Sequence, residues 1–372
     1  MAQKIEFIKL AQSGKARRGV LKTTRGDIQT PAFMPVGTAA TVKAMMPESV
    51  AATGAEVLLG NTYHLMLRPG AERVANLGGL HKFMNWSGPI LTDSGGFQVM
   101  SLSELRKLTE EGVKFKSHVD GAEFNLTPES SMEIQWNLGA DMIFAFDECT
   151  SPLAPHWYQK EAMDRTHRWA QRSLDRHQQL DPDNIQALFG VVQGGRYQDL
   201  REESARVLGA MDFDGYGIGG SFNKDDMASA VAWVNAILPE EKPRHMLGIG
   251  EPMDIFNGVE NGCDLFDCVS PTRVARHGRI YTPDGPINIT NAKYKHDTTP
   301  FVEGYDSYPA KNYTKGYIHH LFKSKEMLGQ ILASIHNLHF IISLTDQIRE
   351  SLYNDTFFEF KKEFMDRYYG EK

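Results

Sequence analysis

The sequence predicts an α/β protein built as a (β/α)8 barrel, and three observations point to this fold class. Eight short apolar runs recur along the chain, and helix-patterned stretches lie between them. The runs are continuously apolar, which is typical of strands buried on both faces of a parallel sheet. A chain of 372 residues is long enough for one large barrel. Eight strand–helix units therefore favour the barrel, with a doubly wound sheet as the alternative.

The eight apolar runs are the predicted barrel strands. They are Ala32–Val36, Val57–Gly60, Pro89–Leu91, Met142–Phe146, Ala187–Val192, Tyr216–Ile218, His245–Ile249 and Asp264–Phe266. Pro128–Leu138 is predicted as a helix because Pro128 follows Thr127, and proline is favoured in the first turn of a helix. Four further stretches are predicted as helices from the same spacing: Trp157–Leu180, Tyr197–Leu208, Met227–Leu238 and Met253–Val259.

Three regions depart from this alternation. Alternating apolar residues in Ile5–Pro31 predict a small antiparallel sheet at the closed end of the barrel. Val113–Leu126 surrounds an Asp-Gly pair and predicts a hairpin inserted after the third strand. The chain becomes irregular after Asp284 and strongly helical from about Lys325. We therefore expect a barrel domain over residues 1–285, and a basic C-terminal subdomain with closing helices, packed on the barrel, over residues 286–372.

Composition limits the class of protein. With 41% hydrophobic and 23% charged residues the chain is an ordinary globular one. It has no apolar run long enough to span a bilayer and no signal peptide, so no membrane association is expected. Three cysteines indicate a reducing cytoplasmic setting and exclude a zinc site of four cysteines.

The charge is unevenly distributed. The chain as a whole is acidic, with a formal charge of −7, but residues 271–325 hold nine Lys and Arg against four Asp and Glu. Aromatic residues are interleaved with these cations. Such a segment is a candidate docking face for a polyanion, although a basic solvated surface is the commoner explanation.

Three carboxylates follow three of the predicted strands. Asp93, Asp147 and Asp267 come where strands end, beside glycines that permit close backbone approach. In a parallel barrel these ends share one rim, where catalytic groups lie. Asp and Gly also begin turns and helices for purely structural reasons. Three equivalent positions nevertheless favour function: one carboxylate as nucleophile and a second group as proton shuttle, as in retaining glycosyl transfer. The third carboxylate and Gln193 suit hydrogen bonds to a planar polar ligand such as a purine, so these residues predict glycosyl or acyl chemistry.

Four long motifs in these same regions resemble the tRNA-guanine transglycosylase (queuine tRNA-ribosyltransferase) family. They are Asp93–Leu102 (DSGGFQVMSL), Gly60–Leu65 (GNTYHL), Leu126–Glu129 (LTPE) and Phe266–Arg273 (FDCVSPTR). The resemblance runs through nearly the whole chain. It implies a barrel with a zinc-bearing insertion, and exchange of the wobble guanine in tRNAs with a GUN anticodon for a 7-deazaguanine base. It also implies a homodimer.

The resemblance assigns roles to individual residues. Asp267 matches the nucleophile that attacks the ribose, and Asp93 matches the general acid/base. The positions that match the base pocket are Phe97, Asp147, Cys149, Gln193, Gly220, Leu247 and Gly248. The positions that match tRNA contacts are Lys43, Arg273 and Arg276, although Lys43 fits an ordinary surface lysine as well.

The chain departs from the family at the metal site. Tyr305, Ser307 and Ala310 stand where the family has three zinc-binding cysteines, and only His336 remains. One imidazole cannot hold a structural zinc that needs four ligands. We therefore predict that no zinc or other cofactor is bound. His336 then becomes a hydrogen-bonded helix histidine, and packing around Tyr305, Tyr308, Tyr313 and Tyr317 replaces the metal.

Two further departures bear on the substrates. Ser221–Asp225 is a shortened loop where the family flanks the 7-substituent of the base, which leaves queuine and its 7-aminomethyl-7-deazaguanine precursor both open. Glu251 stands where a lysine often faces tRNA, which removes one phosphate contact. Two other functions also stay open: a non-catalytic tRNA-binding accessory subunit, and a paralogous enzyme that exchanges another base.

Overall fold

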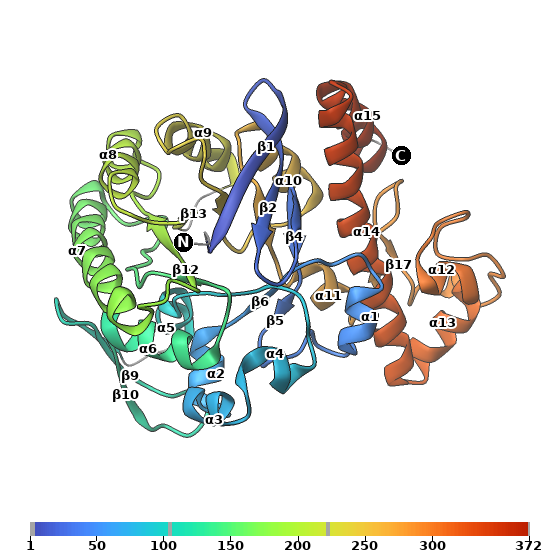
Figure 1. Ribbon diagram of the computed structural model, residues 1–372. Coiled ribbons are helices and arrows are strands. Elements are labelled where there is room, and N and C mark those ends of the chain that lie inside the picture. The colour runs from blue at the N-terminus through green and yellow to red at the C-terminus, as the bar shows by residue number, and fades with distance from the viewer. Residues whose placement is uncertain (1–3, 103–105, 221–223, 371–372) are drawn as a thin grey trace.

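A closed parallel barrel forms the centre of the molecule in the computed structural model, which describes residues 4–102, 106–220 and 224–370 (Figure 1). Its sheet runs in the order β4-β15-β14-β13-β12-β11-β7-β6-β5. The first and last strands of this order, β4 and β5, are consecutive in the chain and are separated only by Pro35. They act as one barrel strand, so the sheet closes into eight barrel strands, which we call staves. The predicted barrel is confirmed, as are all eight predicted strands. The strands are β4 (Ala32–Met34), β5 (Val36–Gly37), β6 (Leu58–Gly60), β7 (Ile90–Thr92), β11 (Met142–Phe144), β12 (Ala187–Val192), β13 (Gly215–Ile218), β14 (Arg244–Met246) and β15 (Leu265–Asp267).

Alternate residues of each stave point to opposite sides, which explains the continuous apolar runs. Met34, Leu59 and Leu91 belong to the cluster inside the barrel, whereas Leu58 and Ile90 pack outward under the helices. Both faces are buried, so polar residues are excluded from almost every strand position.

The helices surround the barrel, and the five that the sequence predicts are present within a few residues of their expected ends. In α6, Thr127 caps the first turn by accepting a hydrogen bond from the Ser130 amide, and Gly139 ends the helix with a φ of +73°. The helices between the staves are α1 (Pro47–Ala51), α2 (Thr62–Leu67), α3 (Ala71–Asn76), α4 (Gly79–Met84), α5 (Gly96–Leu102), α6 (Pro128–Leu138), α7 (His156–Leu180), α8 (Gln198–Gly209), α9 (Lys224–Asn235), α10 (Pro252–Glu260) and α11 (Ser270–Ala275).

An antiparallel sheet covers the N-terminal end of the barrel, as predicted. It consists of β1 (Ile5–Ser13), β2 (Ala16–Thr23) and β3 (Ile28–Thr30). The Arg17 Nε donates to Oδ1 of Asp264 at 3.1 Å, and Lys4 pairs with Asp214 at 3.1 Å. Each of these aspartates directly precedes a stave. The opposite end of the barrel, where the staves finish, is thereby left for the site.

The insertion after the third stave is a three-stranded sheet, one strand larger than the predicted hairpin. β9 (Val113–Lys116) lies between β8 (Arg106–Leu108) and β10 (Glu123–Leu126). Asp120-Gly121 forms the predicted turn, and Gly121 has a φ of +76°. The strand β8 escapes prediction because Arg106-Lys107 carries no apolar alternation.

The C-terminal region is helical, as expected, but it breaks once. The long α14 (Met327–Tyr353) packs against α11 and against β1, β2 and β4, and Asn354–Thr356 turns the chain into α15 (Phe357–Tyr369). By length and composition α14 is the one described helix that could cross a membrane, yet 67% of its most apolar window is buried inside the fold. The smaller elements are β16 (Arg279–Ile280), β17 (Ile287–Asn288), a 3-10 turn (Ala292–Tyr294), α12 (Tyr308–Asn312) and α13 (Lys315–Lys323).

Candidate active site

Asp267 is the last residue of β15 and is 7% exposed at the open end of the barrel. Two groups hold one of its carboxylate oxygens. His245 Nε2 lies 2.8 Å from Oδ1, and the Gly248 amide donates to the same oxygen at 2.9 Å. The other oxygen, Oδ2, accepts no hydrogen bond from the described residues. The carboxylate is therefore held at one oxygen and left free at the other, as a nucleophile requires.

Asp93 directly follows β7 and accepts three hydrogen bonds. The Thr62 amide donates to Oδ1 at 2.8 Å, while Asn61 Nδ2 and Gln98 Nε2 donate to Oδ2 at 2.6 and 2.9 Å. Removal of the carboxyl from water nevertheless raises the pKa of Asp93 to about 6. A group with this pKa can both give and take a proton near neutral pH.

The charge of Asp267 acts on Asp93. The negative charge of Asp267 is one of the causes that raise the pKa of Asp93, which places the two groups within electrostatic reach at the same end of the barrel. Like charges in one enclosed site favour one ionised and one protonated partner. This is the asymmetry that separates a nucleophile from a proton donor.

Asp147 follows β11 and is linked to both neighbouring staves. The Ser94 hydroxyl donates to its Oδ1 at 2.8 Å, and Gln193 Nε2 donates to its Oδ2 at 2.7 Å. Burial raises the pKa of Asp147. The buried Oε1 of Gln193 has no hydrogen-bond partner among the described residues. Asp147 and Gln193 together therefore offer acceptor oxygens that a donor-rich planar base would satisfy.

A buried arginine supports the loop beside Gln193. Arg201 Nε donates to the carbonyl of Gly195 at 2.6 Å, and Nη1 donates to those of Val192 and Gly219 at 3.0 and 2.7 Å. Gly220 follows with a φ of +97°, and a Cβ there would lie 2.7 Å from the guanidinium. Only glycine fits this position. The predicted substrate loop that follows, Ser221–Asp225, lies outside the residues whose side chains the structure describes.

The remaining predicted base contacts lie near this end of the barrel. Phe97 is on α5, four residues after Asp93, and is 52% exposed. Cys149 follows β11 two residues after Asp147, and it is partly buried. Leu247 is half-buried next to Gly248, which has a φ of +71°. The structure thus brings the predicted residues to one rim, and their contacts with a base stay a prediction.

The predicted RNA contacts are cations without ion-pair partners among the described residues. Arg273 and Arg276 lie on and just after α11, which begins three residues after the candidate nucleophile. Arg276 Nη1 has no hydrogen-bond partner in the part of the chain that the structure describes, and burial lowers the pKa of this arginine. Lys43 is exposed in the loop that follows β5. By contrast, Glu251 accepts a hydrogen bond from the Ser270 hydroxyl at 2.7 Å, so it is engaged at the start of α11.

Several site residues escaped prediction from sequence. His245 was counted as part of an apolar run, although a histidine inside a buried strand is itself a signal of a polar partner. Asn61 stands directly after a strand, and Ser94 stands beside the predicted carboxylate Asp93. Those positions are the sequence signal that could have identified them. Gln98 and Arg201 lie on the helices α5 and α8, so reading the residues at the ends of strands could not identify them.

The residues at the family's metal position do not fit a zinc ion. His336 is fully buried; its Nδ1 lies 2.8 Å from the Ser307 hydroxyl and its Nε2 lies 2.9 Å from the Tyr281 carbonyl. Both nitrogens are thus engaged, as the prediction of a hydrogen-bonded histidine required. Within residues 4–102, 106–220 and 224–370, no three His, Cys, Asp or Glu side chains gather to hold a metal.

Aromatic packing in place of the metal stays a prediction, and the four tyrosines lie in two groups. Tyr305 contacts His336, with ring centroids 5.7 Å apart. Tyr313 instead stacks on Tyr317 and meets Tyr308 edge to face, and Tyr308 is 55% exposed.

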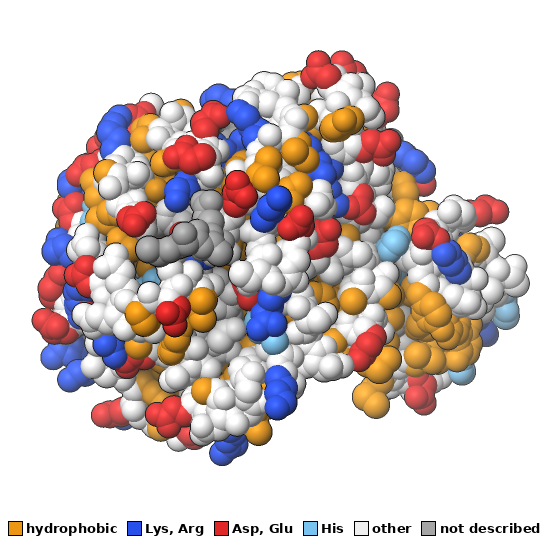
Figure 2. Space-filling model, viewed as in Figure 1, with side chains coloured by type: hydrophobic (Ala, Val, Ile, Leu, Met, Phe, Trp, Pro, Cys, Tyr) orange, Lys and Arg blue, Asp and Glu red, His pale blue; other side chains and the backbone are white. Residues whose placement is uncertain are grey.

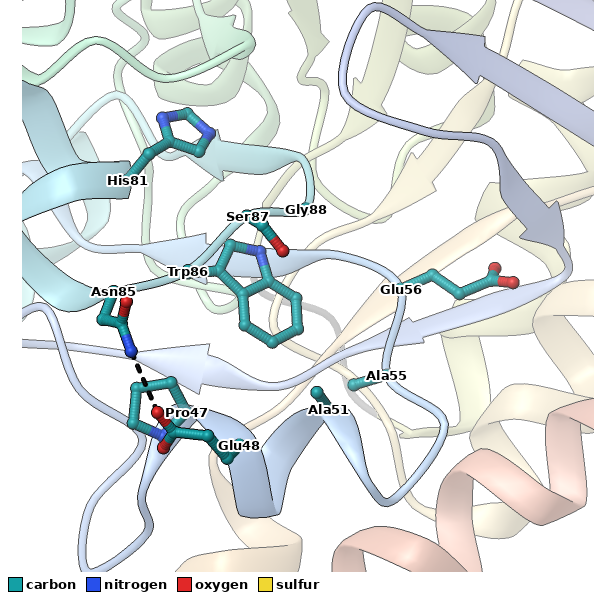
Figure 3. Close-up of a pocket in the computed structure, with 10 residues that line it drawn as sticks. All are labelled: Pro47, Glu48, Ala51, Ala55, Glu56, His81, Asn85, Trp86, Ser87 and Gly88. Atoms are coloured by element: carbon teal, nitrogen blue, oxygen red, sulfur yellow. Dashed lines mark hydrogen bonds between the residues drawn. The ribbon is translucent and has the colours of Figure 1, made fainter.

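A hollow of about 470 Å3 lies elsewhere, between α1 and the segment that joins α4 to β7 (Figure 3). Its polar groups are already paired: Asn85 Nδ2 donates to Glu48 at 2.9 Å, and Glu56 accepts from the Gln29 amide at 2.6 Å. A smaller hollow of about 140 Å3 adjoins Asp147 and Cys149. Only the second hollow belongs to the candidate site.

A closed parallel barrel with a restrained carboxylate and a second carboxyl of raised pKa on the same rim defines a (β/α)8-barrel enzyme. A family model described as "Queuine tRNA-ribosyltransferase" matches residues 12–370. Proteins named queuine tRNA-ribosyltransferase are similar over their full length. The one from Fusobacterium nucleatum is 51% identical over 97% of both chains, and the one from Caldanaerobacter subterraneus is 50% identical over 100% of this chain and 99% of its own. The protein from Caulobacter vibrioides is 51% identical over 97% of both chains. The chain belongs to the queuine tRNA-ribosyltransferase family.

Proposed function

We propose that this enzyme is a tRNA-guanine transglycosylase that exchanges the wobble guanine of GUN-anticodon tRNAs for a 7-deazaguanine base. The observation that carries the proposal is the pairing of Asp267, restrained at one oxygen only, with Asp93, whose pKa is about 6. Family membership supports the same reaction and the tRNA substrate.

The reaction is a double displacement. The free Oδ2 of Asp267 attacks the anomeric carbon of the ribose as the bond from that carbon to guanine breaks, and the Asp93 proton passes to the departing guanine. This leaves an ester between Asp267 and the ribose. Asp93, now ionised, takes a proton from the incoming base, which attacks the same carbon and releases Asp267. Two inversions retain the stereochemistry.

Base selection is assigned to Asp147 and Gln193. Their acceptor oxygens would receive the donors of a guanine-like pyrimidine edge, and Phe97 provides an exposed ring on which the base can stack. The incoming base is queuine or its 7-aminomethyl precursor.

The test is exchange of labelled guanine in a GUN-anticodon tRNA, with queuine and 7-aminomethyl-7-deazaguanine as competing acceptors. Exchange confined to GUN anticodons supports the proposal. Retained tRNA binding without exchange would instead assign the chain as a non-catalytic accessory subunit. Exchange of another base would make it an enzyme of different specificity.

His245→Phe is expected to lower kcat by about tenfold to a hundredfold without weakening tRNA binding. His245 is fully buried and its Nε2 reaches the Asp267 carboxylate, and a hydrogen bond to a charged group contributes about 1.5–3 kcal/mol. Single-turnover rates and tRNA affinity measure the two effects separately. His245→Gln retains an amide donor and serves as the rescue variant. If both variants lose the same activity, a purely structural role for this histidine follows.

We also propose that the enzyme is a cytoplasmic homodimer. Hydrophobic side chains gather over α12 and α13 (Figure 2), where the exposed Tyr308 and Tyr317 both contact the ring of Tyr313. A self-complementary second copy would cover this patch. Sedimentation velocity of the wild type and of Tyr308→Ser/Tyr317→Ser tests the dimer, because the variant should sediment as a monomer.

We propose further that the enzyme folds without zinc, since Ser307 and Tyr281 occupy both nitrogens of His336. Metal analysis should find no stoichiometric zinc, and a chelator should leave Tm unchanged. The variant Tyr305→Cys/Ser307→Cys/Ala310→Cys supplies three thiols beside His336 and is the positive control. Stoichiometric zinc in the wild type would refute the proposal.

The same histidine predicts a loss of stability in acid. Burial lowers the pKa of His336 to about 4, below the value of about 6.5 expected in the unfolded chain. The unfolded state therefore takes up the proton first, so stability is full above pH 6.5 and falls toward pH 4. The free energy of unfolding should fall by about 3 kcal/mol more in the wild type than in His336→Gln over this range. Parallel pH curves for the two proteins would contradict this linkage.

A further inference from the structure

The insertion sheet carries three exposed lysines on its outer surface. Lys107, Lys114 and Lys116 alternate with residues that point inward, and we call these three side chains the lysine face. Lys107 lies directly opposite Lys114 in the β8–β9 register. On the inner surface, Val113 and Phe115 are buried. The sheet is thus amphipathic, with its cations in one cross-strand group.

This arrangement is unfavourable for the protein alone. Like charges directly opposite on one sheet face repel each other. Neither Lys107 nor Lys114 forms an ion pair within the described part of the chain, whereas Lys116 pairs with Glu123, which lies directly opposite it on β10, at 3.9 Å. A polyanion laid across the face would remove the repulsion and pair the free cations.

The inner surface anchors the insertion sheet beside the active site, with Leu108 and Val113 lining the hollow next to Asp147, and the lysines lie on the opposite surface. Phe115 packs in one cluster with Tyr63 and Val99, which lie on α2 and α5. The Tyr63 hydroxyl also lies 3.0 Å from Nδ1 of His118, in the turn that follows β9. The residue before Tyr63 is Thr62, whose amide holds Asp93. The sheet is therefore anchored one residue from a group that binds the general acid/base.

We propose that the lysine face binds the phosphate backbone of the substrate RNA outside the active-site pocket. This inference rests on the proposed function, because it takes RNA as the polyanion. Lysine ammonium groups are compact point charges that suit phosphates rather than base edges. The face therefore adds affinity and orientation but does not read the anticodon sequence.

The test is binding of a fluorescent GUN anticodon stem-loop to Lys107→Gln/Lys114→Gln at several salt concentrations. We expect roughly tenfold weaker binding at low salt. The slope of log affinity against log salt should be shallower by about 1.4, because each phosphate contact contributes about 0.7 with single-stranded RNA. At saturating RNA, kcat should not change. A stem-loop with a different anticodon should lose affinity by the same factor.

The matched control is Lys15→Gln/Lys22→Gln, which removes two exposed lysines from the antiparallel sheet at the opposite end of the barrel. This control changes net charge equally and should leave both affinity and salt slope unchanged. Equal losses in the two double variants would overturn the proposal, because they would show an effect of net charge alone.

Lys114→Glu separates RNA binding from folding. The new carboxylate lies opposite Lys107, so Tm should stay the same or rise, while RNA affinity falls further than in the glutamine variant. Unchanged RNA affinity in Lys114→Glu would overturn the proposal. Because binding is measured without turnover, a protein that binds RNA through this face but exchanges no guanine would refute the proposed function and leave the lysine face standing.

Discussion

Asp267→Asn is expected to abolish guanine exchange, with a loss on the order of 10^4 or more. The amide has no anionic oxygen to attack the ribose, so the covalent ribosyl ester cannot form. The fold should survive, because asparagine Oδ1 can still accept from His245 and the Gly248 amide. The effect is thereby confined to the chemical step.

The covalent intermediate makes this prediction direct. Wild-type enzyme mixed with a GUN stem-loop and then denatured should retain RNA in a band that Asp267→Asn lacks. RNA binding under native conditions should be the same for both proteins. A covalent band in the variant would move the nucleophile to another residue and remove the basis of the proposed mechanism.

Asp93→Asn is expected to slow both half-reactions by about 10^2–10^4. The amide can neither protonate the departing guanine nor deprotonate the incoming base. Its Oδ1 can still accept from the Thr62 amide, and rotation of the Asn61 and Gln98 side-chain amides turns an oxygen of each toward the new Nδ2 in place of a donor. Unfolding curves that match the wild type would show that the lost rate is chemical.

The pH dependence distinguishes the two roles of Asp93. Protonated Asp93 is needed to release guanine, so kcat/KM for tRNA should fall as pH rises through about 6. The ionised form is needed in the second half, so kcat/KM for the base should rise through its pKa. Esterification removes the Asp267 charge that raises this pKa, so the second limb should lie at lower pH. Asp93→Asn should lack both limbs, and their persistence would assign them to another group.

The fold was largely predictable because burial on both faces leaves a strong signature. Almost every strand position of the barrel excludes polar side chains, so eight apolar runs stood out against the helices. The exposed β8 lacks such a signature, so the sequence predicted a two-stranded hairpin where the structure has three strands. Closure of the barrel through Pro35 also came only from the structure, because pairing between β4 and β15 joins residues far apart in the chain.

For the site, the sequence by itself determined which carboxylates end the staves, since parallel strands deliver their last residues to one rim. Only the tertiary structure decided what each carboxylate does. His245 restrains Asp267, while enclosure raises the pKa of Asp93. Hydrogen-bond partners and desolvation depend on groups from other staves and helices, whose distances no local pattern encodes.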